Sequence, residues 1–516
     1  MCVSRCVSHD RQRQGRPSQF GQVAVIPYAD FTYFILLLYV AVPTLILGLL
    51  GRAGWRWALL VTVAMLLVQY HELLDVRPHF PVREIWIVLG FAAWQWVTVR
   101  AFAAAGARAG WLFYGALAMS LLPLLAAKLV PLVSPKSQVG FLGISYVTFR
   151  ALDIVFCLRD RVIAVPETLD LLMFLFFFPT ISAGPIDRYR RFLPDWKRKR
   201  TRAEFLSDLD GAMHRFFRGL FYKFIIAALI KQHWLEPAAR SGSFGALLSY
   251  MYAYSFYLFF DFAGYSAFAI SLSYLFGIHT PENFDRPFLA RNIRDFWNRW
   301  HITLSFWFRD HVYMRFLLAA ARGKWFRSMD TAAILGYFLA FGLMGLWHGI
   351  EPHYILYGFY QGTLLSGFHI FSSWNKAHRY WRDGLLSNAL AIFITFHLVC
   401  FGLLIFSGRI GAPPPQHYLA EIQGVNCNAI SGWVWDKYKP KAPVLVELWD
   451  GDHFLTNISA DQFRQDLLDA GYGNGRHAFR LPTPPQIKDG QSHSIRLRVA
   501  DARSDLASIQ SVVACP

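Results

Sequence analysis

Charged side chains are scarce in this chain of 516 residues, of which only 16% are Asp, Glu, Lys or Arg. A soluble globular domain typically carries about 25% of these residues, so the low charge argues against a water-soluble protein. The composition is instead 55% hydrophobic, and apolar runs recur from Phe31 to Ser407. Because a helix needs roughly 20 apolar residues to cross a bilayer, the sequence predicts a polytopic membrane protein.

Acidic residues are the scarcer of the charged types, with 34 Asp and Glu against 51 Lys and Arg, and the net charge is +17. The basic residues lie in short segments between apolar runs rather than on a polar domain, which argues against nucleic-acid binding. This distribution follows the positive-inside rule. We therefore expect a multi-pass protein of the cytoplasmic membrane with lipid around it, and we place the basic stretch from Arg188 to Arg202 in the cytoplasm.

Cysteine is also rare, with six residues and no CxxC pair. Two of them, Cys157 and Cys400, lie inside apolar runs. The spacing therefore predicts neither a disulfide framework nor a zinc site, and no other metal site is indicated. GxSxG, P-loop and GxGxxG motifs are missing as well, which removes the motif evidence for a serine hydrolase, a P-loop NTPase or a dinucleotide-binding enzyme.

The apolar runs predict an all-α membrane domain of about ten to twelve spans. The run 245–276 is too long for one upright helix, so it holds either two segments or one strongly tilted helix. Residues 1–27 form a basic leader that we expect to be flexible, and the membrane domain covers 28–410. The Pro-rich stretch 411–417 is expected to be a linker.

A small, mostly β soluble domain is predicted for residues 418–516. Apolar and polar residues alternate in 444–449 and again in 493–499, with a turn at Asp450-Gly451-Asp452 between. Alternation with a period of two is typical of antiparallel strands. Trp433 and Trp435 are two residues apart and so share one face of a strand. That face is either a carbohydrate-binding surface or part of the core, and we favour the core.

Two histidines are the candidates for chemistry. His301 follows Trp300, and His348 follows Trp347 at the end of an apolar run, with Gly345 and Gly349 around it. Ionisable side chains at membrane depth are costly and are functional candidates by default, and a neutral imidazole can accept a proton near neutral pH. The alternative is a hydrogen bond between helices.

The same two interpretations apply to other polar residues in apolar runs. We expect His369 and His397 to make hydrogen bonds between helices. Asp261 could belong to a proton relay or ion site, but a packing hydrogen bond to a serine or tyrosine is the simpler interpretation.

Several ungapped motifs carry a resemblance to a known family. They are Gly140–Arg150, Phe174–Phe192, Phe259–Ser266, Asn292–Phe316 and Met344–Gly349, with a general likeness over Ile392–Ser407. Together they resemble the membrane-bound O-acyltransferase family, and within it the branch that transfers D-alanyl groups to teichoic acid. The likeness covers roughly residues 27–410.

The resemblance implies a ring of helices around a central tunnel and acyl transfer to a hydroxyl. His348 matches the family's essential histidine and His301 the second histidine of the tunnel. The neighbouring positions are candidates for substrate binding: Asn298, Arg299, Trp300, Ser305, Asp310 and Trp347.

No bound cofactor is implied. The donor would be an acyl thioester on a phosphopantetheinyl carrier protein or on coenzyme A. The acceptor would be an extracytoplasmic polysaccharide or a partner acyltransferase. Two donors remain open, a D-alanyl group and an acetyl or other short acyl group.

The C-terminal hundred residues depart from that branch. Ile430–Asp436, Ala460–Leu467 and Gly473–Phe479 resemble a small domain attached to some bacterial glycosyltransferases, which favours exopolysaccharide biosynthesis over a teichoic-acid acceptor. A different class of function also remains open. The chain could be a transporter of acyl groups or polysaccharide that performs no chemistry.

Overall fold

The computed structural model describes eleven segments of the chain. Helices α2 to α18 form one compact unit and strands β1 to β8 form a second. The predicted leader, apart from Pro27, and the predicted linker lie outside the described residues. The described segments are 27–29, 31–52, 54–70, 84–106, 110–133, 140–240, 243–381, 384–410, 418–451, 453–499 and 504–514.

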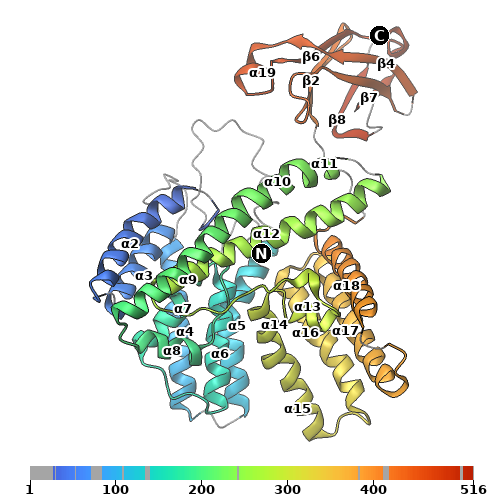
Figure 1. The fold of residues 1–516 in the computed structure, drawn as a ribbon. Helices are drawn as coiled ribbons and strands as arrows, with labels where there is room; N and C mark the ends of the chain where they lie inside the picture. The colour runs from blue at the N-terminus through green and yellow to red at the C-terminus, as the bar shows by residue number, and fades with distance from the viewer. Residues whose placement is uncertain are drawn as a thin grey trace. The chain divides into compact units, whose positions relative to one another are not determined.

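The first unit is helical (Figure 1). Its α-helices are α2 Phe31–Leu49, α3 Trp55–Tyr70, α4 Glu84–Ala104, α5 Gly110–Val133, α6 Ile144–Arg159, α7 Thr168–Phe176, α8 Tyr189–Lys197, α9 Arg202–Leu220, α10 Ala228–Ile230, α11 Glu236–Ala239, α12 Phe244–Leu275, α13 Ile293–Trp297, α14 Ile302–Phe308, α15 Met314–Gly323, α16 Met329–His348, α17 Pro352–His378 and α18 Leu385–Phe406. Short 3-10 helices cover Phe178–Thr180 and Pro287–Leu289, and π-helical turns cover Phe221–Ala227, Lys231–Leu235 and Arg309–Tyr313.

Six of the described helices are long and apolar enough to cross a membrane: α2, α4, α5, α12, α16 and α18. Helices α3 and α7, the latter with the 3-10 turn after it, are apolar but shorter. Six such helices fit a multi-pass membrane protein, but the predicted ten to twelve spans are not confirmed. The run at 245–276 is one uninterrupted helix of 32 residues, so the interpretation as two segments was wrong.

Helices α9 to α11, with the π-helical turns between them, run from Arg202 to Ala239 without a break and pack along α12 (Figure 1). Local signals set the start of both helices: Thr201 and Glu204 form a capping box for α9, and the Ser243 hydroxyl accepts from the Ala246 amide in α12. Midway along this pair of packed helices, Lys223 forms an ion pair with Asp261 of α12. The predicted partner of Asp261, a serine or tyrosine, was wrong.

Helices α16 and α17 approach each other closely through glycines. A Cβ atom added at Gly345 would lie 2.5 Å from the Tyr354 carbonyl oxygen, and one at Gly358 would lie 2.5 Å from the Phe341 carbonyl oxygen. Both distances are too short for real contacts, so these two backbones can meet only because neither position has a side chain. This contact fixes the last turn of α16, which carries His348.

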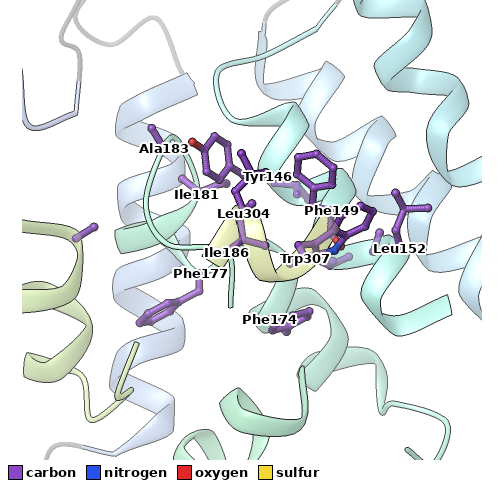
Figure 2. Close-up of a cluster of buried hydrophobic side chains, with 14 of the residues drawn as sticks. Tyr146, Phe149, Leu152, Phe174, Phe177, Ile181, Ala183, Ile186, Leu304 and Trp307 are labelled. Atoms are coloured by element: carbon purple, nitrogen blue, oxygen red, sulfur yellow. The ribbon is translucent and has the colours of Figure 1, made fainter. Parts of the chain in front are cut away.

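The interior around α6, α7 and α14 is filled by apolar side chains (Figure 2). Within it, the fully buried Arg150 donates to the carbonyl oxygens of Phe174, Leu175 and Thr180 at 2.8–3.1 Å. Trp307 of α14 donates from its indole nitrogen to the Phe149 carbonyl at 3.1 Å. These hydrogen bonds join α6 to α7, to the turn after it and to α14, and they pair most of the buried donors, although Arg150 Nε has no partner among the described residues.

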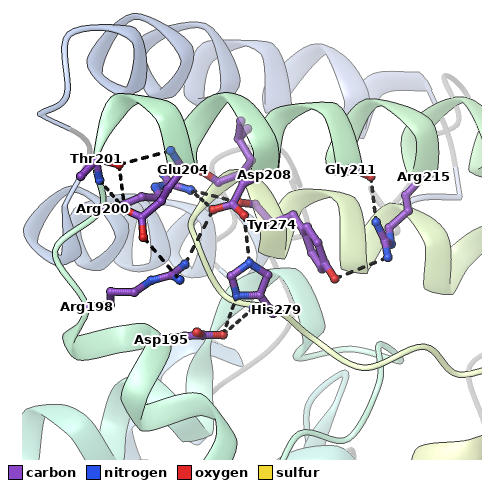
Figure 3. Close-up of polar contacts among 11 residues, drawn as sticks. Asp195, Arg198, Arg200, Thr201, Glu204, Asp208, Gly211, Arg215, Tyr274 and His279 are labelled. Atoms are coloured by element: carbon purple, nitrogen blue, oxygen red, sulfur yellow. Dashed lines mark hydrogen bonds and ion pairs between the residues drawn. The ribbon is translucent and has the colours of Figure 1, made fainter.

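A polar network joins α8, α9 and the end of α12 (Figure 3). His279 contacts Asp195 at 3.0 Å through Nδ1 and Asp208 at 2.9 Å through Nε2. Arg200 contacts Asp208 and donates to the last carbonyls of α12, at Tyr274 and Leu275. The basic stretch predicted to face the cytoplasm is therefore partly neutralised by local carboxylates and a helix end.

The second unit is a pair of antiparallel sheets, as the alternating sequence predicts. Their strand orders are β1-β2-β6-β5 and β4-β3-β7-β8. The elements are β1 Tyr418–Val425, β2 Ala429–Asp436, β3 Val444–Asp450, β4 His453–Ala460, β5 Gln462–Phe463, α19 Gln465–Asp469, β6 Arg476–Pro482, the 3-10 turn Pro485–Ile487, β7 Ser492–Val499 and β8 Ser504–Ala514. Leu448 of β3 pairs with Leu497 of β7, and both are buried.

The two tryptophans of β2 pack on the same partner, Tyr472. Trp433 is buried and stacks on the Tyr472 ring at 4.8 Å, whereas Trp435 is half-buried and lies 5.2 Å from it. The preference for a core role is thus confirmed for Trp433 and holds in part for Trp435. Cys427 is disulfide-bonded, whereas Cys157 and Cys400 are free. The cysteine spacing predicted no disulfide framework, and it gave no sign of this single bond at Cys427.

Candidate active site

One cavity of the helical unit brings the two candidate histidines together. Its volume is about 70 Å³, which is room for several water molecules or a small group of a substrate. Apart from the histidines, the lining is aromatic and aliphatic. It consists of Tyr146, Ala183, Tyr254, Leu258, Phe262, Trp297, Trp300, His301, Leu304, Met344, Trp347, His348, Tyr357, Leu403 and Phe406. An apolar cavity with a few convergent polar groups is typical of small-molecule sites.

His301 is held by a short pairing between two segments. The Asp285 amide donates to the Arg299 carbonyl at 2.9 Å, the Ile302 amide donates to the Asn283 carbonyl at 2.9 Å, and Phe284 faces Trp300 in an antiparallel bridge. His301 itself has φ of 44°, in the left-handed region. A non-glycine residue there costs about 1–3 kcal/mol, and such strain clusters at functional sites.

Asn283 connects this pairing to the His301 ring. It is fully buried, and its Oδ1 lies 3.1 Å from His301 Nδ1. The same oxygen accepts from the Thr303 hydroxyl at 2.9 Å, and Nδ2 donates to the Ser266 hydroxyl at 3.3 Å. His301 therefore has one ring nitrogen fixed by a neutral amide, while its ring forms part of the cavity wall.

His348 has a different environment. It is the last residue of α16 and packs against Trp347, Tyr354 and Phe406, with ring centroids 4.5, 6.0 and 4.9 Å away. Its buried Nδ1 has no hydrogen-bond partner among the described residues, and neither has the indole nitrogen of Trp347. An unpaired buried polar atom costs about 1–3 kcal/mol, and the described residues offer neither atom a partner.

The structure separates the predicted site residues into two sets. His301, His348, Trp300 and Trp347 line the cavity, whereas Asn298, Arg299, Ser305 and Asp310 do not belong to its lining.

Each of the four residues outside the lining has another partner or place. Asn298 is exposed and ends α13. Arg299 pairs with Asp295 at 2.8 Å. Ser305 donates to the Trp300 carbonyl at 3.0 Å, and Asp310 contacts Arg188 at 3.2 Å.

Two polar residues at the site were missed by the sequence reasoning. Asn283 lies in a polar connection far from His301 in the sequence, so no spacing rule could pair them. Lys128 lies inside the apolar helix α5 and donates to the carbonyl of Trp347. A lysine inside an apolar run was a usable signal, and it was not followed.

The two histidines that the sequence analysis assigned to helix packing have structural partners. His369 of α17 contacts Asp330 of α16 at 2.8 Å, which confirms the predicted bond between helices. His397 contacts the Phe393 carbonyl of its own helix at 2.7 Å, so the expected bond to another helix was wrong there. No group of three or more metal-binding side chains occurs among the described residues.

The comparisons with known proteins identify the family of this chain. The sequence profile of the membrane-bound O-acyltransferase family matches residues 56–407. A teichoic acid D-alanyltransferase of Bacillus subtilis (strain 168) is 42% identical over 396 residues, which are 74% of this chain and 98% of that protein. The chain belongs to the membrane-bound O-acyltransferase family.

Two further relatives indicate the range of this similarity. A teichoic acid D-alanyltransferase of Lacticaseibacillus rhamnosus is 35% identical over 74% of this chain and 97% of its own length. A probable alginate O-acetylase of Pseudomonas aeruginosa is 33% identical, but over 51% of this chain and 48% of its own length. The similarity to the D-alanyltransferases thus extends over nearly their whole length.

Proposed function

We propose that this protein transfers an acyl group from a cytoplasmic thioester to a hydroxyl of a cell-envelope or secreted polysaccharide, directly or through a partner acyltransferase. The observation that carries the proposal is that His301 and His348 line one and the same cavity, whose wall is otherwise apolar and aromatic. Such a wall excludes bulk water, which would otherwise hydrolyse the thioester. The family and the names of the relatives support the same reaction class.

His348 is the proposed general base. It would take the proton of the acceptor hydroxyl as the oxygen attacks the thioester carbonyl. The tetrahedral intermediate then collapses, the carbon–sulfur bond breaks, and the thiolate leaves with a proton returned by the imidazolium. His348 lines the cavity, and no hydrogen bond to its ring is made among the described residues. This supports the role, because a base needs a nitrogen that no protein donor occupies.

The proposed donor is a D-alanyl thioester on a phosphopantetheinyl carrier protein. The long alignments with two D-alanyltransferases support it. An acetyl group, from a carrier or coenzyme A, is the second candidate, supported by the shorter alignment with the alginate O-acetylase. Among the described residues, the cavity wall contains no Asp or Glu side chain, so an alanyl ammonium would have to be met there by tyrosine hydroxyls or aromatic faces.

The test is the incorporation of labelled D-alanyl or acetyl groups into polymer, in membranes that contain equal amounts of each variant. His348→Ala is expected to lose at least the ~10²–10⁴-fold that general acid–base catalysis contributes. His301→Ala is expected to lose less. His397→Ala is the matched control, because that ring contacts a carbonyl of its own helix outside the cavity wall. Near-normal transfer by the His348 variant would refute the assignment.

Transport without chemistry is the competing function. It predicts that His348→Gln, which keeps a polar side chain of similar size, retains the flux of acyl groups across the membrane. Acyl transfer predicts that this variant fails, because an amide cannot take a proton near neutral pH. The same labelled membranes therefore distinguish the two functions.

A further inference from the structure

The hydrogen-bond pattern around Asn283 fixes which end of its amide faces His301. The Thr303 main-chain N–H, which can only donate, points at this end of the amide at 3.3 Å. The Thr303 hydroxyl, which accepts from the Ile186 amide at 3.0 Å, lies 2.9 Å from the same atom and can donate its own hydrogen to it. An NH2 group cannot accept from the main-chain N–H, so this atom is the amide oxygen, and the Thr303 hydroxyl donates to it as well.

The identity of this atom determines the protonation of the imidazole. An amide oxygen only accepts, so the His301 Nδ1 that faces it at 3.1 Å must carry a hydrogen. A neutral imidazole has a single N–H, which leaves a lone pair on Nε2. No hydrogen bond to Nε2 is made within the described part of the chain. Because the ring lines the cavity, the free lone pair belongs to its open edge.

We propose that Asn283 is a positioning residue that holds neutral His301 as the Nδ1–H tautomer, so that Nε2 presents a hydrogen-bond acceptor to the acceptor hydroxyl in the cavity. The part of this inference that concerns the hydroxyl rests on the proposed acyl transfer. The tautomer itself does not.

The surroundings of Asn283 suit this task. The residue is fully buried, and the pairing of Asn283 with Ile302 holds the backbone of both segments in place. A carboxylate at the same position would favour an imidazolium with hydrogens on both nitrogens, and the acceptor on Nε2 would be lost. An uncharged amide orients the ring while leaving it neutral.

Nitrogen-15 NMR of the full chain in lipid bilayers tests the tautomer directly. The protein is labelled with 15N-histidine, and the His301 signals are assigned by difference from His301→Gln. The expected result is a protonated Nδ1 and an unprotonated Nε2 in the unmodified protein. A protonated Nε2 would overturn the proposal. Because this readout does not depend on activity, it stands even if the protein transfers no acyl group.

A double-variant cycle tests the action through His301. Asn283→Leu is expected to lower kcat by about 10–100-fold, the range seen when a group that orients a functional imidazole is removed, with little change in KM for the thioester. Combined with His301→Gln, it should cost no more than His301→Gln alone. Losses that multiply in the double variant would contradict the proposal.

The control for this cycle is Asn375→Leu, the same exchange at an amide that contacts Trp381 at the end of α17. It should keep both kcat and KM. If Asn283→Leu does not accumulate in membranes, the NMR measurement on the unmodified protein alone decides the question.

Discussion

The ammonium group of Lys128 donates a hydrogen bond to the main-chain carbonyl of Trp347, the residue before His348. Lys128 belongs to α5, one of the six helices apolar enough to span a membrane. A lysine at such depth is costly and is retained where it has a specific partner. Its charge also lies at the C-terminal end of α16, where the helix dipole favours a cation. Lys128 thus fixes the turn that carries the proposed base.

Replacing Lys128 tests this link. Lys128→Met keeps the length and the apolar stem but removes the charge and the donor, so the last turn of α16 loses its tether. We expect acyl transfer to fall by about tenfold, the effect of about 1.4 kcal/mol on a barrier, while Lys128→Arg keeps most of the activity. Transfer is measured at equal protein amounts. Lys376→Met, at the exposed end of α17, is the control, and equal activity of the Met and Arg variants at 128 would contradict the role.

The ion pair between Lys223 and Asp261 is a test of stability. Both side chains are mostly buried, with 12% and 14% exposed. Asp261→Asn is expected to lower the free energy of unfolding by up to about 3–5 kcal/mol, because it leaves a charged lysine without its partner. The double exchange Lys223→Met with Asp261→Leu should cost less than either single change. Thermal unfolding in detergent measures all three, and additive losses would argue against a coupled pair.

The C-terminal unit is expected to fold by itself. Its two sheets enclose their own apolar core, formed by Ile430, Val434, Val446, Leu448, Phe479, Ile495, Leu497 and Val499. Residues 418–516 expressed alone should therefore show one cooperative unfolding transition. Circular dichroism against temperature checks this. A spectrum of disordered chain, or a broad transition without cooperativity, would show that the sheets depend on the rest of the protein.

His493 gives this unit a pH-dependent stability. Hydrogen bonds from His493 to Asp489 at 2.8 Å and Asp450 at 2.6 Å raise the pKa of its imidazole above the usual value. Since protonation is favoured in the folded state, the stabilisation is fully present below the unfolded pKa of about 6.5. It is lost as the pH rises through the folded pKa.

The comparison of His493→Gln with the parent domain measures this effect. The parent should have the higher unfolding temperature at about pH 5.5. The difference should shrink at about pH 9, where the imidazole is neutral in both the folded and the unfolded state. A difference that is the same at both values would show that the two carboxylates act on His493 only as neutral hydrogen-bond partners.

The sequence predicted those helices and strands whose residues show one strong local pattern. Apolar runs predicted the helices, and the alternation of apolar and polar residues predicted β3 and β7. Both patterns arise because buried positions take apolar residues and recur at short, regular spacings. The count of spans could not be obtained this way. Helix α17 is long, but its polar residues lower its mean hydropathy, and it is not among the six helices that could span a membrane.

The site shows the same division. His301 and His348 were candidates as imidazoles in or beside apolar runs, but so were His369 and His397. The resemblance to the family singled out the first two, and the cavity wall contains both. Asn283 could not be found, since its role depends on a pairing between segments that are polar and irregular in sequence. Arg299 and Asp310 illustrate the opposite error. They are close to His301 in the sequence and were therefore predicted to bind substrate, but Arg299 forms an ion pair with Asp295 and Asp310 forms one with Arg188.

The π-helical turn at Phe221–Ala227 has a consequence for insertions and deletions. Such a turn contains one residue more than an α-helical turn needs, and it lies within the continuous helix that runs from Arg202 to Ala239. Deleting one residue inside the turn would convert it to α-helix, and the helix segments before and after it would still present the same faces to α12. Deleting one residue in α9 would rotate everything on one side of the cut by about 100° relative to the other and separate Lys223 from Asp261.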